Sequence, residues 1–242
     1  MKKISYTTLF ILVIFCSVGF GPFSFLLNRT VQVPVNKKGW VDQEIKRVHT
    51  QAENLDLDVL KMSLVAYLSA QKKGLPTKQL LTIIDYSKPS SERRLWVIDL
   101  KNAKVLFNTW VSHGRNSGKI FATSFSNEKG SLKSSLGVFL TSKAPYNGSN
   151  GYSLRLVGLE SGINDKALQR DIVFHGAWYA HPNVIKKYGF LGRSWGCPAV
   201  SVETAKPLIN TIKGKSLVFV YYPYRKWLNH STFLASGRTE PV

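Results

Sequence analysis

The sequence predicts a mainly antiparallel β domain with one or two short helices, preceded by a small helical segment. From residue 81 onward, apolar segments of strand length alternate with turns rich in Gly, Asn, Ser and Pro. Upstream of residue 76, leucines recur at helical spacing instead. Hydrophobic residues make up 44% of the 242 residues, which is enough apolar material for one ordinary core.

Seven segments after residue 80 are rich in β-branched and aromatic residues and are predicted to be strands. They are LTIID (81–85), RLWVIDL (94–100), VLFNTWV (105–111), GVFLT (137–141), YSLRLVG (152–158), DIVFH (171–175) and SLVFVYY (216–222). The second and third form a predicted hairpin through KNAK. One clear helix is predicted over 202–213, with Ser201 as its N-cap and Gly214 just past its end.

The remaining segments follow from changes in composition. Residues 41–73 carry leucines near helical spacing and predict one or two packing helices, which Gly74 and Pro76 end. The predicted organisation is a linker over 28–40, a helical segment over 41–76, a β domain over 77–226 and a C-terminal tail over 227–242.

Residues 1–27 have the pattern of an export signal. Lys2 and Lys3 precede the apolar run Leu9–Phe15, and small residues follow at 17–19. This resembles a secretory signal peptide. An uncleaved membrane anchor is the alternative, because apolar residues continue to Leu27. The protein is therefore expected to be exported to the periplasm or cell envelope, either free or anchored in the inner membrane.

The charge is strongly basic. The chain has 33 Lys and Arg against 14 Asp and Glu, for a formal net charge of +19. Such a field favours polyanions and anionic surfaces, including the cell envelope. The basic residues are scattered rather than gathered into a recognisable motif, so we expect no nucleic-acid partner.

The chain has two cysteines, Cys16 in the N-terminal segment 1–27 and Cys197 in the stretch GRSWGCPAV (192–200). If Cys16 lies in the signal or membrane, Cys197 forms no internal disulfide and is either a buried apolar residue or a reactive thiol. His175 ends the predicted strand DIVFH, where an imidazole can take a proton from a thiol. Gly196 would let a substrate carbonyl approach the backbone, and the amides of residues 195–197 would then form an oxyanion hole.

The same residues allow two other interpretations, a serine hydrolase site and a metal site. Ser194 matches G-x-S-x-G, but a nucleophile elbow needs a strand before it and a helix directly after it. Here KKYGFL precedes the serine and Pro198 follows, which argues against a serine hydrolase. His113, His175, His181 and Cys197 lack the spacing of a metal site, so neither a metal nor another cofactor is expected.

The pairs His175–Gly176 and Ser194-x-Gly196-Cys197 resemble the active-site signature of YkuD-like L,D-transpeptidases. The resemblance is closest to the murein L,D-transpeptidase catalytic domain family and spans roughly residues 81–223. It rests on several stretches in order: DYSKPSSERRLWVIDL, VSHGRNSG, FSNEKGSLKSSLGVF, HGAWY and GRSWGCPAV. It implies an L,D-transpeptidase-like β-sandwich or barrel.

The resemblance assigns roles residue by residue. It implies that Cys197 is the nucleophile, His175 the general base, Gly196 the glycine before the thiol and Ser194 the polar residue two positions before it. Gly176, Ser194 and Tyr179 are expected at the substrate site. His113 and Asn116 are expected to stabilise a turn rather than to line the donor groove.

Two positions depart from the family pattern. Trp195 stands where many relatives have a histidine, and Ala199 where many have an arginine. Our hypothesis is that Arg193 supplies the missing cation, and we place both Arg193 and Trp195 at the substrate site.

The implied reaction is acyl transfer on peptidoglycan stem tetrapeptides. Cys197 would attack the carbonyl of the third residue, release D-Ala and form a thioester, which an amine of a second stem would take up to make a cross-link. Two alternatives stay open: an L,D-carboxypeptidase that uses water as acceptor, and a non-catalytic protein that binds the cell wall.

Overall fold

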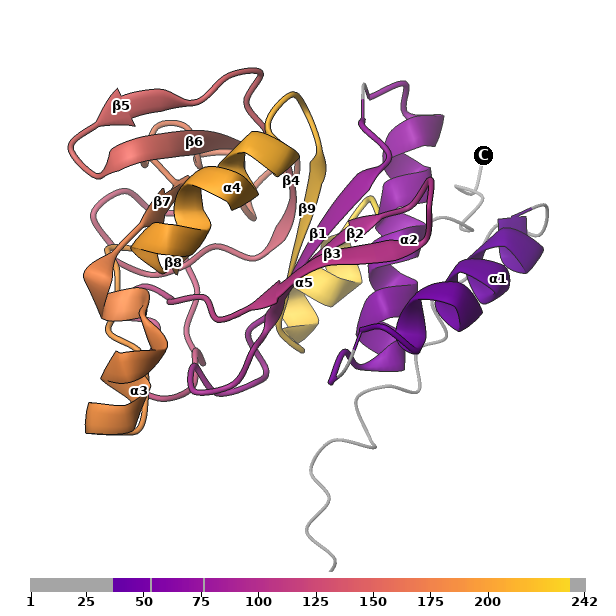
Figure 1. Cartoon of the computed structure of the whole chain (residues 1–242). Coiled ribbons are helices and arrows are strands. Elements are labelled where there is room, and N and C mark those ends of the chain that lie inside the picture. Colours follow the sequence, from indigo (N-terminus) through magenta and orange to yellow (C-terminus); the bar gives the residue numbers. More distant parts are fainter. Residues whose placement is uncertain (1–36, 53, 76, 236–242) are drawn as a thin grey trace, which may run out of the picture. The chain divides into compact units, whose positions relative to one another are not determined.

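The computed structural model describes residues 37–52, 54–75 and 77–235 (Figure 1). Its centre is a mixed sheet in the order β3-β2-β1-β9-β4-β6-β7-β8, with β5 paired to β6. The strands are β1 Leu80–Asp85, β2 Leu95–Asp99, β3 Lys104–Thr109, β4 Gly137–Thr141, β5 Tyr146–Gly148, β6 Gly151–Gly158, β7 Val173–Gly176, β8 Ala199–Val200 and β9 Leu217–Tyr221.

The sheet curves into a nearly closed barrel. Beyond β3, Ser112 forms an antiparallel bridge with Ala199 of β8, and its amide donates to the Ala199 carbonyl at 2.8 Å. This bridge joins the two ends of the strand order. The mainly β prediction is confirmed, as is the β2–β3 hairpin. Two pairs, β1 with β9 and β7 with β8, are parallel, so the sheet is mixed rather than purely antiparallel.

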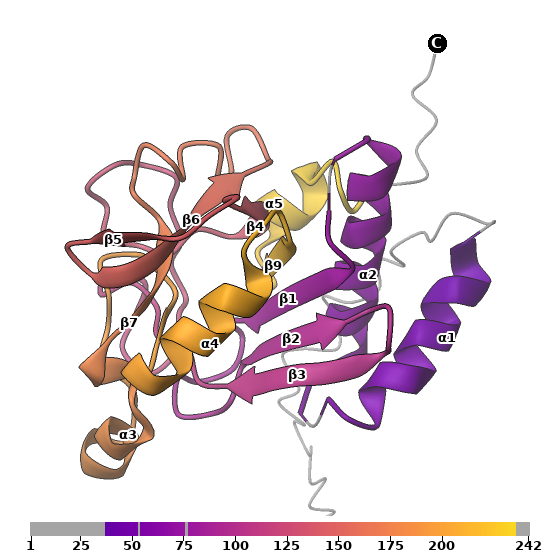
Figure 2. The ribbon, with the colours of Figure 1, turned by 45° about the horizontal axis from the view of Figure 1, so that its top comes forward.

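Helices cover the sheet at two places (Figures 1 and 2). The long helix α2 packs against β1 and β9 and also against α1, while α4 packs against β6, β7 and β8. The helices are α1 Lys38–His49, α2 Leu57–Lys72, α3 Pro182–Tyr188, α4 Val202–Ile212 and α5 Arg225–His230, with a 3₁₀ turn η2 at Trp178–Ala180.

The predicted N-cap of α4 and the predicted glycine after its C-terminus are both confirmed. The Ser201 hydroxyl accepts from the Thr204 amide at 3.3 Å and so satisfies one of the free donors of the first turn. Gly214, two residues after the last helical residue, has φ +87°, a left-handed conformation that glycine adopts without strain. The chain can therefore turn directly from α4 into β9.

The helical prediction was less complete at the two ends of the domain. Helix α1 begins at Lys38, inside the segment predicted as a linker. Helices α3 and α5 were not predicted. Trp227 of α5 is fully buried, and its Nε1 donates to Glu160 Oε2 at 3.1 Å. Residues 227–235, which the sequence placed in a tail, thus belong to the folded unit.

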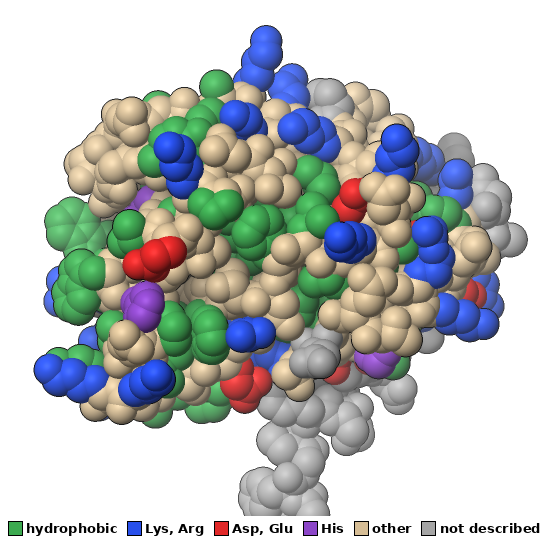
Figure 3. Space-filling view, in the orientation of Figure 1, with side chains coloured by type: hydrophobic (Ala, Val, Ile, Leu, Met, Phe, Trp, Pro, Cys, Tyr) green, Lys and Arg blue, Asp and Glu red, His purple; other side chains and the backbone are tan. Residues whose placement is uncertain are grey.

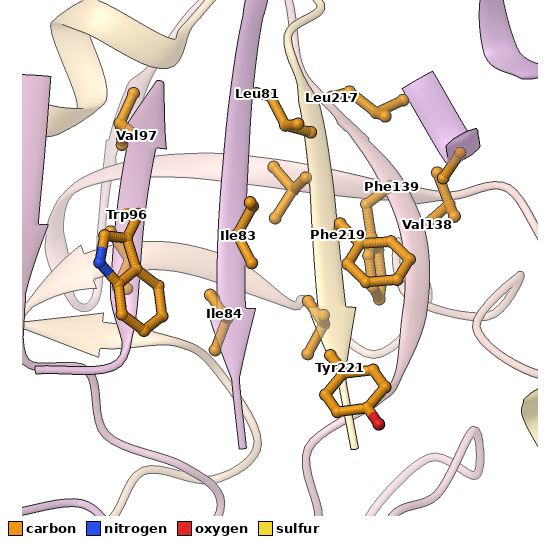
Figure 4. Packing of buried hydrophobic residues seen from close by; sticks show 14 of the residues in the cluster. Leu81, Ile83, Ile84, Trp96, Val97, Val138, Phe139, Leu217, Phe219 and Tyr221 are labelled. Carbon is orange, nitrogen blue, oxygen red and sulfur yellow. The ribbon is translucent and has the colours of Figure 1, made fainter. Parts of the chain in front are cut away.

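The apolar core lies where β1, β2, β4 and β9 meet (Figure 4). Each fully buried aliphatic or aromatic side chain there contributes roughly 1.5–3 kcal/mol through removal from water. The labelled side chains are Leu81, Ile83, Ile84, Trp96, Val97, Val138, Phe139, Leu217, Phe219 and Tyr221.

The face shown in Figure 3 carries Lys and Arg side chains spread over most of its area, with few acidic groups between them. This matches the scattered charge of the sequence. Within the described ranges, no helix has both the length and the apolar character needed to cross a bilayer. The predicted export signal or anchor at residues 1–27 lies outside the described residues.

Candidate active site around Cys197

The thiol lies in a turn that enters the last strand of the sheet. Residues 192–198 precede β8, and β8 pairs in parallel with β7. In this register His175 is opposite Ala199, two residues beyond Cys197. The pairing brings the two segments that carry the predicted nucleophile and base side by side, although 21 residues of chain separate them.

Cys197 is 9% exposed, and its Sγ donates to the Asp171 carbonyl at 3.4 Å. Burial raises the pKa of the thiol above its usual 9.0, and the charge of Asp171 adds to the rise. A hydrogen bond from the Val173 amide and the charge of Arg170 act in the opposite direction. The resting group is therefore a neutral thiol at pH 7.

His175 is 5% exposed, and its Nδ1 lies 3.0 Å from the Gly176 carbonyl. A carbonyl only accepts, so Nδ1 carries the proton and Nε2 holds the free lone pair. Burial lowers the pKa of this ring below 6.5. Among the described residues no hydrogen bond joins the ring to Cys197. The pair is thus a thiol and a neutral imidazole.

Ser194 holds the turn together. Its hydroxyl donates to the Cys197 carbonyl at 2.6 Å and accepts from the Gly196 amide at 3.1 Å. Its side chain is only 3% exposed. The sequence placed Ser194 among the substrate contacts, but the turn itself takes up both hydrogen-bonding capacities of the hydroxyl.

Gly196 is required by geometry. Its φ is +127°, and a Cβ added there would lie 2.8 Å from the Lys133 carbonyl oxygen. The position that a Cβ would take is therefore occupied by backbone, which explains the glycine. That a substrate carbonyl approaches the backbone here stays a prediction. The Gly196 carbonyl accepts from Ser134 Oγ at 3.2 Å, which ties the turn to a neighbouring loop.

Two amides of the turn are available as donors. The Gly196 amide is engaged by Ser194, so it is not one of them. Within the described chain, the amides of Trp195 and Cys197 donate to no protein acceptor. Both belong to the turn that carries the sulfur, and amides without a protein acceptor beside a nucleophile are the donors that an oxyanion hole uses.

Gly176 and Tyr179 support the site from the side of β7. A Cβ at Gly176 would lie 2.9 Å from the Ala205 side chain, so this glycine lets α4 approach β7 closely. The Tyr179 carbonyl accepts from the Gly192 amide at 2.8 Å, at the start of the cysteine turn. Burial, with a smaller effect of Cys197, raises the pKa of Tyr179 to about 12, so it stays protonated.

Two tryptophans form an exposed aromatic rim. Trp195 is 75% exposed and Trp178 is 74% exposed, and Trp178 packs edge-on against Tyr179. Exposed aromatic rings beside a candidate site are suited to packing against a bound ligand. Tyr152 of β6 hydrogen-bonds Asn210 of α4 at 2.8 Å.

Arg193 contacts a loop rather than the thiol. Its Nη1 donates to the carbonyls of Arg115 and Gly118, at 3.3 and 3.2 Å. The arginine thereby ties the turn to residues 112–118. That it supplies the family's missing cation stays a prediction.

His113 is buried and neutral. Arg94 Nη2 lies 2.7 Å from its Nδ1, so the ring accepts there. Burial, with the charge of Arg94, lowers the pKa of His113 to about 3. Asn116 donates to the Ser131 carbonyl, as expected of a turn residue. In the described ranges no three His, Cys, Asp or Glu side chains lie close enough together to hold a metal ion.

Sequence reasoning missed Arg170 and Asp171, which precede β7. Asp171 holds the sulfur through its carbonyl, and Arg170 lies close enough to influence it. Neither belongs to a motif. Their position directly before the strand that carries His175 was the signal available in the sequence.

Three solved structures illustrate the likeness to known proteins. An L,D-transpeptidase from Mycobacterium smegmatis is 15% identical, with a TM-score of 0.36 over 60% of this chain and 59% of its own. Mycobacterium tuberculosis L,D-transpeptidase 1 is 14% identical, with a TM-score of 0.33 over 60% and 62%. An L,D-transpeptidase from Stackebrandtia nassauensis is 13% identical, with a TM-score of 0.34 over 74% and 76%.

The chain thus spans about three fifths of the length of the first two structures. No curated protein matches it. The family comparison is more extensive, because the model of the L,D-transpeptidase catalytic domain matches residues 51–221. That range holds the whole sheet and every residue of the site described above. The chain therefore belongs to the L,D-transpeptidase catalytic domain family.

Proposed function

We propose that this protein is a cysteine acyltransferase that acts on the stem tetrapeptides of peptidoglycan. The observation that carries the proposal is the parallel β7–β8 pairing, which sets the segments of Cys197 and His175 side by side within a matched family domain. The family acts on the cell wall outside the cytoplasm, which agrees with the predicted export. The basic surface suits an anionic envelope.

The first half of the reaction forms a thioester. Nε2 of His175 takes the proton of Cys197 as the sulfur attacks the carbonyl of the third stem residue. The carbonyl oxygen becomes an oxyanion, which the amides of Trp195 and Cys197 stabilise. When the intermediate collapses, the carbon–nitrogen bond breaks, and His175 returns the proton to the departing amine of D-Ala.

The second half releases the enzyme. An amine of another stem attacks the thioester, and Nε2 accepts the proton that the amine loses. The carbon–sulfur bond breaks, and the thiolate recovers that proton from the imidazolium. Water in place of the amine would give a carboxypeptidase. The side chains of Trp195 and Trp178 would hold the substrate at the rim.

The neutral thiol–imidazole pair predicts the pH dependence. Burial holds the pKa of His175 below 6.5 and that of Cys197 above 9.0. One proton must remain on the pair, so kcat/KM should rise as His175 deprotonates in mild acid and fall when the thiol ionises in base. The expected profile is a broad plateau that includes pH 7–8.5.

The test is to incubate the full chain with purified muropeptides and follow the products by mass spectrometry. Cross-linked dimers indicate transfer, whereas monomeric tripeptides indicate hydrolysis. Cys197→Ala should lower the rate by at least about 10³-fold, as removal of a covalent nucleophile does. His175→Asn keeps a donor for the Gly176 carbonyl but lacks the base, and should be similarly impaired.

Cys16→Ser is the matched control, because it removes the other thiol of the chain and should leave the rate unchanged. A covalent adduct on Cys197 after exposure to a tetrapeptide would identify the acylated residue directly. Full activity of the Cys197→Ala variant would overturn the proposal and favour a non-catalytic protein that binds the cell wall.

A further inference from the structure

Arg170, just before β7, is held by a loop rather than by an acid. Its Nη1 donates to the Ser126 carbonyl at 2.6 Å and to the Ser135 hydroxyl. Its Nη2 donates to the Lys133 carbonyl at 2.6 Å and to Ser131 Oγ at 3.2 Å. All four acceptors are neutral, and all belong to the loop 126–135.

Arg170 has no ion-pair partner among residues 37–52, 54–75 and 77–235. Asp171 pairs with Arg155 at 2.6 Å, and Glu128 pairs with Lys166 at 2.7 Å. The charge of Glu128 acts on Arg170 only from beyond ion-pair distance. The guanidinium is therefore free to stabilise a negative charge that forms close to it.

Arg170 is linked to the Cys197 thiol in two ways. Through the backbone, the next residue is Asp171, whose carbonyl accepts from Cys197 Sγ. Through the loop, the Lys133 carbonyl that Arg170 holds lies against Gly196, the residue before the cysteine. The guanidinium and the sulfur thus share the same small region of the fold.

Among the residues that the structure describes, Arg170 is the only cation that measurably affects the pKa of Cys197. Asp171 contributes negative charge, the neighbouring Tyr86 and Tyr179 stay protonated, and the ring of His175 on β7 is neutral. Arg193, the other arginine of the site, donates to carbonyls of the loop 112–118 instead.

We infer that Arg170 is a positioning residue for the nucleophile: its guanidinium is the counter-charge of the Cys197 thiolate, and its hydrogen bonds hold the loop that shapes the cysteine turn. This places on Arg170 the task that the family's arginine would have at Ala199. The inference rests on the proposed function for its purpose, but the charge effect exists whatever the substrate. The charge of Arg170 indeed acts to lower the thiol pKa.

The test is the pH dependence of alkylation of Cys197 by iodoacetamide in the full chain, with the modified peptide quantified by mass spectrometry. Arg170→Gln should raise the thiol pKa by about one unit, the lower end of the shift that a neighbouring charge causes, so that below this pKa alkylation slows roughly 10-fold. Arg170→Lys restores the charge and should bring the pKa back to within about 0.3 units of the parent.

Arg225→Gln is the charge control. It removes an equal charge from an exposed side chain at the start of α5, so its thiol pKa should match the parent. Arg193→Gln separates the two candidate cations. If that variant shifts the thiol pKa and Arg170→Gln does not, the inference is overturned in favour of Arg193.

A second pair of variants covers the case in which Arg170→Gln fails to fold, as judged by circular dichroism. Ser131→Asp gives Arg170 a carboxylate partner and keeps the loop in place, so the thiol pKa should rise. Ser131→Asn has nearly the same shape without the charge and should leave the pKa unchanged. Equal pKa values in these two variants would contradict the inference.

The readout needs no peptidoglycan, so the two proposals can fail separately. A chain that is inactive on muropeptides but shows the expected alkylation profiles would refute the proposed function and support the role of Arg170. A fully active chain whose thiol pKa ignores residue 170 would refute the inference alone.

Discussion

Two regions of the sheet are built in different ways: the β1–β9 pair in the middle of the strand order and the β7–β8 pair at one end of it. In the first, which we call the apolar region, β1 and β9 run in parallel with most side chains buried and apolar, and α2 covers them. In the second, which we call the polar region, β7 and β8 are short, and the segments around them bury hydroxyl and imidazole groups that hydrogen-bond the backbone or Arg94. These buried polar residues include His113, Ser117, Ser134, Ser135 and Ser194.

The difference separates stability from chemistry. Apolar burial is non-directional, and it tolerates small shifts as long as volume is filled. Buried hydrogen bonds are directional and costly to leave unmade, so they fix one arrangement of backbone and side chains. The apolar region thus supplies most of the folding free energy, and the polar region holds the thiol turn in one conformation.

The largest effect on stability is expected in the apolar region. Trp227 is fully buried and packs against Phe219 and Tyr221 of β9. Trp227→Ala should lower the free energy of unfolding by about 3–5 kcal/mol, because it leaves a large cavity and removes one of the hydrogen bonds that Glu160 Oε2 accepts. Urea titration measures this. Trp227→Phe, which keeps most of the packing, should cost less; equal losses would show that packing is not the cause.

The second largest effect is expected from acid, which should lower the free energy of unfolding through His113 in the polar region. The pKa of His113 is about 3 in the folded protein, against a usual 6.5. Between these values the unfolded chain binds the extra proton, so stability is complete above pH 6.5 and falls as the pH drops toward 3. At pH 4 the loss is roughly 3 kcal/mol.

His113→Asn provides the comparison, since its side-chain oxygen can accept from Arg94 and does not titrate. The loss of unfolding free energy between pH 7 and pH 4 should be about 3 kcal/mol smaller in this variant than in the parent. Groups common to both proteins cancel in the difference. An unchanged loss would mean that His113 is not the residue responsible.

A smaller loss is expected at the cysteine turn. Gly196→Ala puts a Cβ 2.8 Å from the Lys133 oxygen at a φ of +127°, and should cost about 2–3 kcal/mol. Gly130→Ala is the matched control: its φ is +75°, but a Cβ there meets nothing within 4 Å, so it should cost only about 1 kcal/mol. Denaturant unfolding of both variants checks the contrast. Similar losses would show that backbone strain alone, without the contact, determines the effect.

The smallest effect on stability is expected at the exposed rim. Trp195 is 75% exposed, so Trp195→Ala should change the free energy of unfolding by less than about 0.5 kcal/mol. If the ring packs on the stem peptide, kcat/KM should nevertheless fall about 3- to 10-fold, the range for one aromatic contact. Unchanged kinetics would remove Trp195 from the substrate site.

Local sequence patterns suffice to predict the strands of the apolar core. Segments such as GVFLT and LTIID, bounded by turn residues, specify local structure because β propensity and turn chemistry act within a few residues. The motif residues also identified the nucleophile and base as candidates. Short elements were not predicted, because they have too few residues to form a periodic pattern. Strand β8 has two residues, α3 has seven and α5 has six.

The contacts that support the site form between segments far apart in the chain, so they appear only in the tertiary structure. The parallel pairing of β7 with β8, the fit of Gly196 against the Lys133 carbonyl and the clamp of Arg170 on the loop 126–135 join residues far apart in the chain. No local rule encodes such contacts, because each depends on where the sheet brings the backbone. Cys197 and Arg170 lie 27 positions apart in the sequence, and folding alone places the cation within reach of the sulfur.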